Sequence, residues 1–186
     1  DRSDRKLEEK YLGSFYNDIV ADSIEIREML ESSENNIDIS GRTVGAMQTG
    51  TLTNDSALLV LSLMATYNNL NLENATYESV VNSGNLGLIR DFEIREQIVY
   101  YYRSHEDMRY VEGVYNDYIT NYILPYVSKK LDFISGQFVD DFSVDDIEFR
   151  NIASGYFVLA RQKSQYVSTL DSLNRDLRMV LSAHLD

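Results

Sequence analysis

The two histidines are the side chains of this chain best suited to bind a metal or move a proton, and their spacing excludes the usual helical metal site. A carboxylate di-iron bundle needs Glu three residues before His on facing helices. Tyr102 and Leu181 stand at that distance before His105 and His184. The HExxH motif, the glycine-rich phosphate loops and the G-x-S-x-G motif are absent as well. We therefore predict no catalytic residue, no cofactor and no metal site.

Three polar residues interrupt apolar helical stripes and are the candidates for a buried polar layer. His105 is interpreted as a histidine at the edge of the core, or else as a pH-sensing or ligand-contacting group, because histidine titrates near neutrality. Glu112 and Lys163 either extend their charged ends to solvent or pair with each other. If the last two long helices form a hairpin centred near residue 139, Glu112 lies opposite about residue 166, within reach of Lys163.

Tyrosine is concentrated in one part of the chain. Eight of the 14 tyrosines lie between Tyr100 and Tyr126. Tyr115, Tyr118 and Tyr122 are spaced to share one broad helical face with Tyr126. They either pack in the core with their hydroxyls at its edge, or form an aromatic patch for a partner or small ligand.

Composition narrows the class of protein. The 186 residues contain 17 basic and 30 acidic side chains, for a net charge of −13. That charge repels a phosphate backbone, so we predict no nucleic-acid partner. The absence of cysteine excludes disulfides, thiolate metal sites and cysteine nucleophiles. The acidic residues at 140, 141, 145 and 146 lack the spacing of a calcium loop and are assigned to the start of the last helix.

The elements that must position these residues are helices, because one proline and nine glycines leave few interruptions. A first helix spans about residues 4–49, with Gly41 and Gly45 as the places where it bends or ends. Two short helices follow, at about 57–65 and 75–82. A third long helix starts at Asp91 and is kinked or restarted at Pro125, and a connection at 135–143 leads to a last helix ending near 185.

These elements predict an all-α fold over a single helical domain, residues 1–186. Three long helices and a pair of short ones bury their stripes as an elongated antiparallel bundle resembling a four-helix bundle. We expect Ile98, Leu170, Leu173 and Leu177 in the core.

Two segments carry a resemblance to a known family. They are Asp4-Arg5-Lys6-Leu7-Glu8-Glu9-Lys10-Tyr11-Leu12, and Tyr77-Glu78-Ser79-Val80-Val81-Asn82-Ser83-Gly84-Asn85-Leu86-Gly87-Leu88-Ile89 with the following Ile94-Arg95 and Tyr100-Tyr101-Tyr102. The chain resembles an uncharacterised family of small bacterial proteins that have a basic N-terminus, one transmembrane helix and a helical domain of this size. The resemblance implies a membrane helix preceding Asp1 and a domain facing the periplasm. It implies no activity and no site residues.

Three classes of function remain after these exclusions. The first is a non-enzymatic, membrane-tethered helical domain that binds a protein or cell-envelope partner or senses a signal. The second is a carrier of a small ligand or cofactor in the bundle interior, and the third, disfavoured by the missing motifs, is an enzyme. We expect partner contact at the tyrosine face first, and then at the end of the bundle near residues 45–55.

Overall fold

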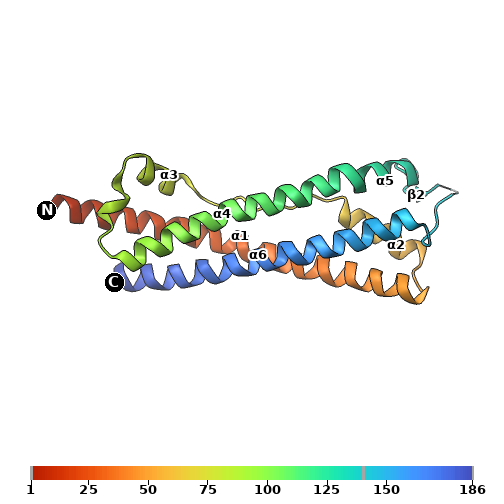
Figure 1. Ribbon diagram of the computed structural model, residues 1–186, viewed down its shortest axis with the longest axis horizontal. Helices are drawn as coiled ribbons and strands as arrows, with labels where there is room; N and C mark the ends of the chain where they lie inside the picture. Colours follow the sequence, from red (N-terminus) through yellow and green to blue (C-terminus); the bar gives the residue numbers. More distant parts are fainter. Residues whose placement is uncertain (1, 140, 186) are drawn as a thin grey trace. The chain divides into compact units, whose positions relative to one another are not determined.

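The computed structural model describes residues 2–139 and 141–185, and it confirms the predicted all-α fold (Figure 1). Three long helices pack antiparallel, α6 running against α1 and α4, and two short helices, α2 and α3, accompany them. Two sequence predictions involve residues outside this range: the membrane helix was expected to precede Asp1, and Asp140 was one of the acidic residues assigned to the start of the last helix. The α-helices are α1 Arg2–Thr49, α2 Asn54–Met64, α3 Ala75–Asn82, α4 Phe92–Tyr118, α5 Leu124–Lys130 and α6 Ile147–Leu185. A 3₁₀ turn, Asn85–Leu88, precedes α4, and two short strands, β1 Leu131–Asp132 and β2 Gln137–Phe138, precede α6.

Local sequence signals set most helix ends. Thr53 caps α2 by accepting a hydrogen bond from the Ser56 amide, and Gly84 takes the left-handed conformation after α3 at φ +72°. The first helix does not end at Gly41 or Gly45, the two positions at which we predicted that it bends or ends. The helix continues through both and ends at Thr49, where Gly50 has φ +67°.

Helix α4 passes into α5 through a π-helical segment, Ile119–Ile123. Pro125 lies in the first turn of α5, where its missing N–H costs least, so a helix does restart there as predicted. The π segment inserts extra residues into the helical repeat and rotates the stripe that follows it. As a result Ile123 is buried, whereas Tyr122 is exposed.

The connection to the last helix contains a hairpin that the sequence analysis did not predict. β1 and β2 pair antiparallel, with Leu131 opposite Phe138. Gly136 supplies the left-handed turn residue at φ +69°. Asp146 caps α6 by accepting a hydrogen bond from the amide of Glu148.

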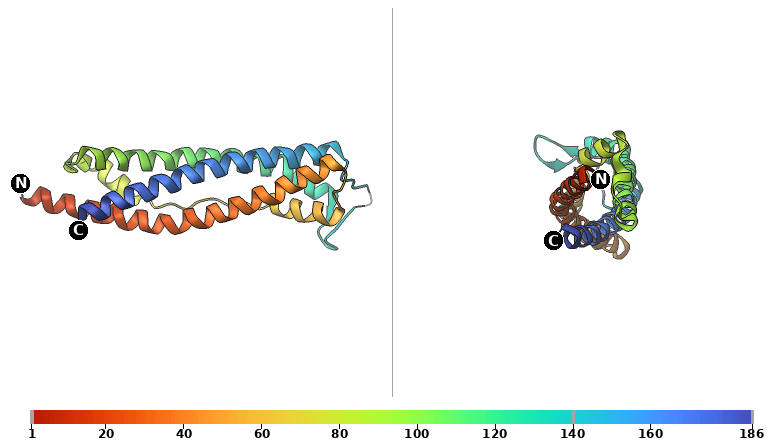
Figure 2. Two further views of the ribbon diagram at one scale, coloured as in Figure 1. Left: turned by 90° about the horizontal axis from the view of Figure 1, so that it is seen from below. Right: turned by 90° about the vertical axis from the view of Figure 1, so that its left-hand side faces the viewer.

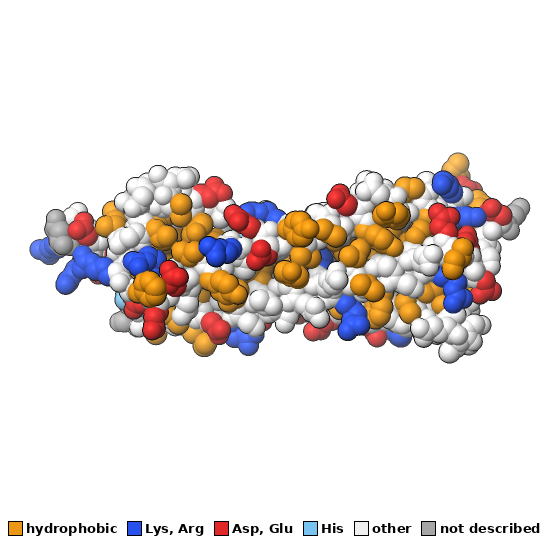
Figure 3. Space-filling model, in the orientation of Figure 1, with side chains coloured by type: hydrophobic (Ala, Val, Ile, Leu, Met, Phe, Trp, Pro, Cys, Tyr) orange, Lys and Arg blue, Asp and Glu red, His pale blue; other side chains and the backbone are white. Residues whose placement is uncertain are grey.

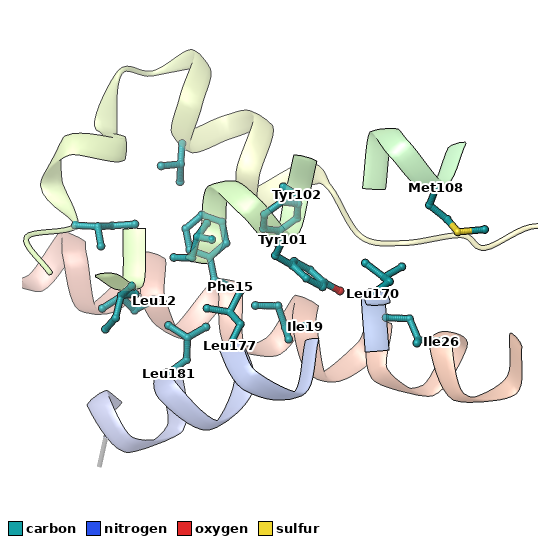
Figure 4. Packing of buried hydrophobic residues seen from close by; sticks show 14 of the residues in the cluster. Leu12, Phe15, Ile19, Ile26, Tyr101, Tyr102, Met108, Leu170, Leu177 and Leu181 are labelled. Carbon is teal, nitrogen blue, oxygen red and sulfur yellow. The ribbon is translucent and has the colours of Figure 1, made fainter. Parts of the chain in front are cut away.

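The chain divides into two compact units, of which unit 1 comprises residues 1–30, 70–109 and 166–186. Within it the first part of α1, the start of α4 and the end of α6 contribute to one apolar cluster. The ribbon of the helices is seen end-on in the right-hand view of Figure 2. Figure 4 shows Phe15 and Ile19 of α1 packing with Tyr101 of α4 and Leu177 of α6. Of the four predicted core residues, Ile98, Leu170 and Leu177 are buried and Leu173 is partly buried.

Unit 2 comprises residues 31–69 and 110–165 and has its own apolar cluster. Helix α2 contributes Val60 and Met64, the π segment contributes Ile119 and Ile123, and α6 contributes Phe149. All five residues are 0% exposed, so this interior is closed to solvent.

Candidate functional site

Glu112 and Lys163, the predicted pair in unit 2, do approach each other. The Lys163 Nζ lies 3.8 Å from the Glu112 Oε1, and both side chains are buried. Lys163 also donates a hydrogen bond to the carbonyl oxygen of Asn68 and lies 4.8 Å from the centre of the Tyr115 ring. Burial lowers the pKa of Lys163, and the nearby Glu112 carboxylate opposes that shift. The prediction that the two side chains approach is therefore confirmed, and snorkelling to solvent does not occur.

Tyr115, a second predicted site residue, belongs to the same buried region. Its hydroxyl donates to the Tyr156 hydroxyl at 2.6 Å, and the two rings lie 5.5 Å apart. Burial raises the pKa of Tyr115 far above its usual range. Tyr115 is therefore a core residue, as one of the two interpretations predicted.

Tyr118 and Tyr122 do not share a helical face with the buried Tyr115, so the prediction of one common tyrosine face is wrong. Tyr110, Val114 and Tyr118 follow one another at four-residue spacing, and the ring of Tyr122 lies 5.1 Å from that of Tyr118. We call these four residues the outer α4 row. Tyr110 is 75% exposed and Tyr122 59% exposed. In the space-filling view, apolar side chains gather along α4 and α6 (Figure 3).

The outer α4 row is anchored to α6 at one point. The Tyr118 hydroxyl donates to the carbonyl oxygen of Ile152 at 3.2 Å, and its ring lies over Gly155. A β-carbon at position 155 would collide with the Tyr118 hydroxyl. The glycine therefore provides the space that holds Tyr118 half-buried, and Tyr118 in turn supports the exposed ring of Tyr122.

His105 lies in unit 1, in a buried polar cluster that the sequence analysis missed. At the centre of the cluster is Asp22, which is 1% exposed. Its carboxylate accepts hydrogen bonds from the Tyr101 hydroxyl and from the backbone amide of Glu73, each at 2.7 Å. Asn174 completes the cluster by donating to the Tyr101 hydroxyl at 3.1 Å and to the carbonyl oxygen of Ile19 at 2.8 Å. In this way the cluster ties α1, α4, α6 and the segment before α3 together.

The orientation of Tyr101 explains how this cluster forms. Figure 4 shows its side chain reaching from α4 toward α1 and α6, between Ile19 and Leu170, with the hydroxyl at the far end. The ring therefore packs in the apolar interior, while the hydroxyl meets Asp22 and Asn174. Burial raises the pKa of Tyr101 far above its usual range, so this hydroxyl keeps its proton and donates it.

Burial controls the charges in the cluster. It raises the pKa of Asp22 from 3.8 to about 6, against the two hydrogen bonds that favour the carboxylate. It lowers the pKa of His105 from 6.5 to about 4, and Arg109 adds to that effect. The His105 Nε2 lies 3.8 Å from the Asp22 Oδ2, and neither ring nitrogen of His105 has a hydrogen-bond partner among the described residues. Because the imidazole stays neutral at pH 7, this contact is not an ion pair there.

The sequence contained a signal for this cluster. The stripe of the first helix passes from Ile19 to Ile26, and Asp22 fills the position between them where an apolar residue is expected. Asn174 similarly lies four residues after Leu170, on the buried face of α6. Two polar residues at core positions of different helices predict a buried hydrogen bond.

A hollow of about 270 Å³ opens in unit 2 between the end of α1 and the start of α2. Ile39, Thr43, Leu52 and Leu59 line it together with Arg42. It lies near the end predicted as a second contact region. Its volume is just below the ~300 Å³ at which ligand pockets begin, so it gives little support to a small-ligand carrier.

Neither a metal centre nor a membrane span is found in the part of the chain that the structure describes. Within residues 2–139 and 141–185, no three or more His, Asp or Glu side chains are grouped so that they could hold a metal ion. Over the same residues, every helix is too short or too polar to cross a membrane. Comparison of the chain with protein-family models, curated proteins and solved structures finds no match. The resemblance described above therefore stays a prediction.

Proposed function

We propose that this chain is a non-enzymatic helical domain that binds a protein partner through the outer α4 row. The observation that carries the proposal is the exposure of Tyr110 and Tyr122 beside a Tyr118 that is held in place by α6. Tyrosine contributes a large contact area at a small entropic cost and keeps a hydroxyl for water or for a partner. A row whose central ring is already fixed loses little freedom on binding.

The polar clusters support a binding role over a catalytic one. Asp22 and His105 in unit 1 and Glu112 and Lys163 in unit 2 are all at most 5% exposed. A substrate cannot reach side chains that are closed off by packed helices, and a general acid or base must lie within hydrogen-bond distance of the group it serves. We interpret both clusters as polar ties that fix the pairing of the helices.

The proposal includes tethering to a membrane and a location outside the cytoplasm. Both rest on the resemblance of residues 4–12 and 77–89 to membrane-anchored bacterial proteins. The net charge of −13 favours a partner whose contact surface carries basic residues.

Site-specific photocrosslinking tests the proposal. The full-length protein would carry a photoreactive phenylalanine analogue at position 122 in its native cells, and a matched protein would carry it at Glu34, an exposed residue of α1 in the same unit. We expect one dominant protein adduct from position 122 and none of that mass from position 34. Tyr110→Ser should reduce the adduct at least about fivefold, because Tyr110 lies on the same row.

Two outcomes would contradict the proposal. The first is an equal adduct yield from positions 122 and 34, which would mean that the row has no special role in contact. The second is turnover of a substrate that is lost in His105→Gln, which would make the unit 1 cluster catalytic.

A further inference from the structure

The hairpin between α5 and α6 holds two bulky apolar side chains in solvent. Phe133 is 70% exposed and Ile134 is 99% exposed, next to each other at the turn between β1 and β2. Turn positions usually carry Gly, Asn, Asp, Ser or Pro. A single exposed apolar residue needs no explanation, but an adjacent pair at the apex of a turn is an unusual arrangement.

The turn that carries these residues is held by several hydrogen bonds. The Asp132 carboxylate accepts from the Ile134 amide at 2.9 Å and from the Ser135 hydroxyl at 2.7 Å. The Gly136 amide donates to the carbonyl oxygen of Asp132 at 2.8 Å. Phe133 and Ile134 are therefore presented by an ordered backbone, which reduces the entropy lost when they become buried in a complex.

The hairpin is also joined to the core of unit 2. Phe138 of β2 stacks on Phe142, with ring centres 3.6 Å apart and planes 3° apart. Phe142 in turn meets the buried ring of Phe149 edge-on, with centres 5.7 Å apart. The base of the hairpin is thus part of the packed interior, while only its apex extends from it.

The charged side chains around the hairpin indicate which kind of surface its apex can contact. Asp141 is 75% exposed at its side chain and Asp145 80% exposed, and Asp132 and Asp146 lie close in sequence. Lys130 pairs with Asp141 at 3.1 Å, and Arg150 lies 3.9 Å from Asp145. Residues 129–150 hold six acidic and three basic side chains, so an excess of acidic charge remains around the hairpin. An acidic surround repels the anionic surface of a bilayer and attracts a basic one.

We propose that Phe133 and Ile134 form an apolar finger that inserts into a pocket of a protein partner whose rim is basic. This contact is separate from the outer α4 row and does not depend on it. The finger supplies the apolar anchor, and the excess acidic charge around its base attracts the basic rim. Anchors of this kind carry most of the affinity of an interface.

The first experiment places the photoreactive phenylalanine analogue at position 134 of the full-length protein in its native cells. We expect an adduct with one protein, and its crosslinked peptide should map to an apolar pocket flanked by Lys or Arg. The adduct yield should fall at least about tenfold in Phe133→Ser and several-fold in Asp145→Asn. Phe92→Ser removes an aromatic residue that is similarly exposed, at 62%, in unit 1 and should leave the yield unchanged.

A second measurement keeps the test decisive if a variant folds poorly. Circular dichroism and thermal unfolding of Phe133→Ser should match those of the unmodified protein, because the side chain lies in solvent. Flotation would use vesicles of phosphatidylcholine alone and of phosphatidylcholine with 30% phosphatidylglycerol, and sedimentation equilibrium would report self-association.

Each alternative occupant gives a result that overturns the proposal. Co-flotation with either vesicle that is lost in Phe133→Ser would assign the finger to a lipid surface. A dimer that dissociates in Phe133→Ser would assign it to a second copy of the chain. An adduct at position 134 that is equally strong in Phe133→Ser would show that the apex makes no specific contact. Failure to form any adduct from position 134 in the otherwise unmodified protein, while position 122 still gives its adduct, would refute the finger alone.

Discussion

The buried cluster of unit 1 predicts two opposed titrations that can be separated by mutation. The folded-state pKa of Asp22 is raised from 3.8 to about 6. An acid whose pKa is raised by folding stabilises the protein fully below its unfolded pKa, and that contribution is lost as the pH rises through 6. At ~1.36 kcal/mol per pKa unit, ionising Asp22 in the folded state costs about 3 kcal/mol at pH 7.

His105 has the opposite dependence. Its folded-state pKa is lowered from 6.5 to about 4. Folding therefore favours the neutral imidazole, and its contribution is fully present above pH 6.5 and lost as the pH falls through 4. The same conversion gives about 3 kcal/mol for the full loss. Between pH 4 and 6 the two groups nearly cancel, which makes the stability of the cluster almost independent of pH.

Single substitutions should expose each titration. The assay is the free energy of unfolding from urea titrations at intervals between pH 4 and 7.5, expressed as variant minus unmodified protein. For Asp22→Asn this difference should rise by about 3 kcal/mol across the range, because the cost of the carboxylate is removed. For His105→Gln it should fall by a similar amount. The exposed Asp176→Asn controls for the loss of one carboxylate outside the cluster.

A flat difference for both variants would refute the reasoning, because it would show that neither group changes its proton affinity on folding. A slope of the opposite sign for Asp22→Asn would mean that its two hydrogen bonds outweigh its burial. Helical circular dichroism at pH 7 verifies that each variant remains folded before the comparison is made.

Three further predictions concern packing in unit 2. Glu112→Gln and Lys163→Met should each lower the free energy of unfolding by about 3 kcal/mol, because each leaves one buried charge without its partner. The double variant should lose clearly less than the sum of the two single losses. Additive losses in urea unfolding would contradict the pairing. Gly155→Ala should raise the free energy of unfolding by about 1 kcal/mol in a Tyr118→Ala background but not in the protein that keeps Tyr118. An equal gain in both backgrounds would show that the Tyr118 ring does not occupy the space beside Gly155. Gly136→Ala should lower stability by about 1 kcal/mol through its positive φ, and an unchanged melting temperature would contradict the turn geometry.

The fold was predictable where its determinants are local. The capping by Thr53, the left-handed Gly84 and the helix restart at Pro125 follow from short-range chemistry. The pairing of Glu112 with Lys163 was predictable because both lie in one helical hairpin, so a simple register count places them together. The π segment was not predictable from periodicity, and this is why Tyr122 was expected to share a helical face with Tyr115.

The Asp22 cluster shows what sequence alone could not supply. Asp22 and Tyr101 are 79 residues apart, and Asn174 reaches Ile19 across 155 residues. Their polar side chains at core positions were visible in the stripes, but their partners depend on how the long helices align in unit 1. The hairpin was missed because its strands have only two residues each, too few for an alternating pattern.

The most direct test of the binding function is the affinity between the purified protein and the partner captured at position 122, measured by titration calorimetry. Tyr110→Ser combined with Tyr122→Ser removes the two most exposed tyrosines of the outer α4 row and leaves its anchor, Tyr118, in place. The proposal predicts at least a tenfold weaker Kd with an unchanged melting temperature. An unchanged Kd in a normally folded double variant would contradict it.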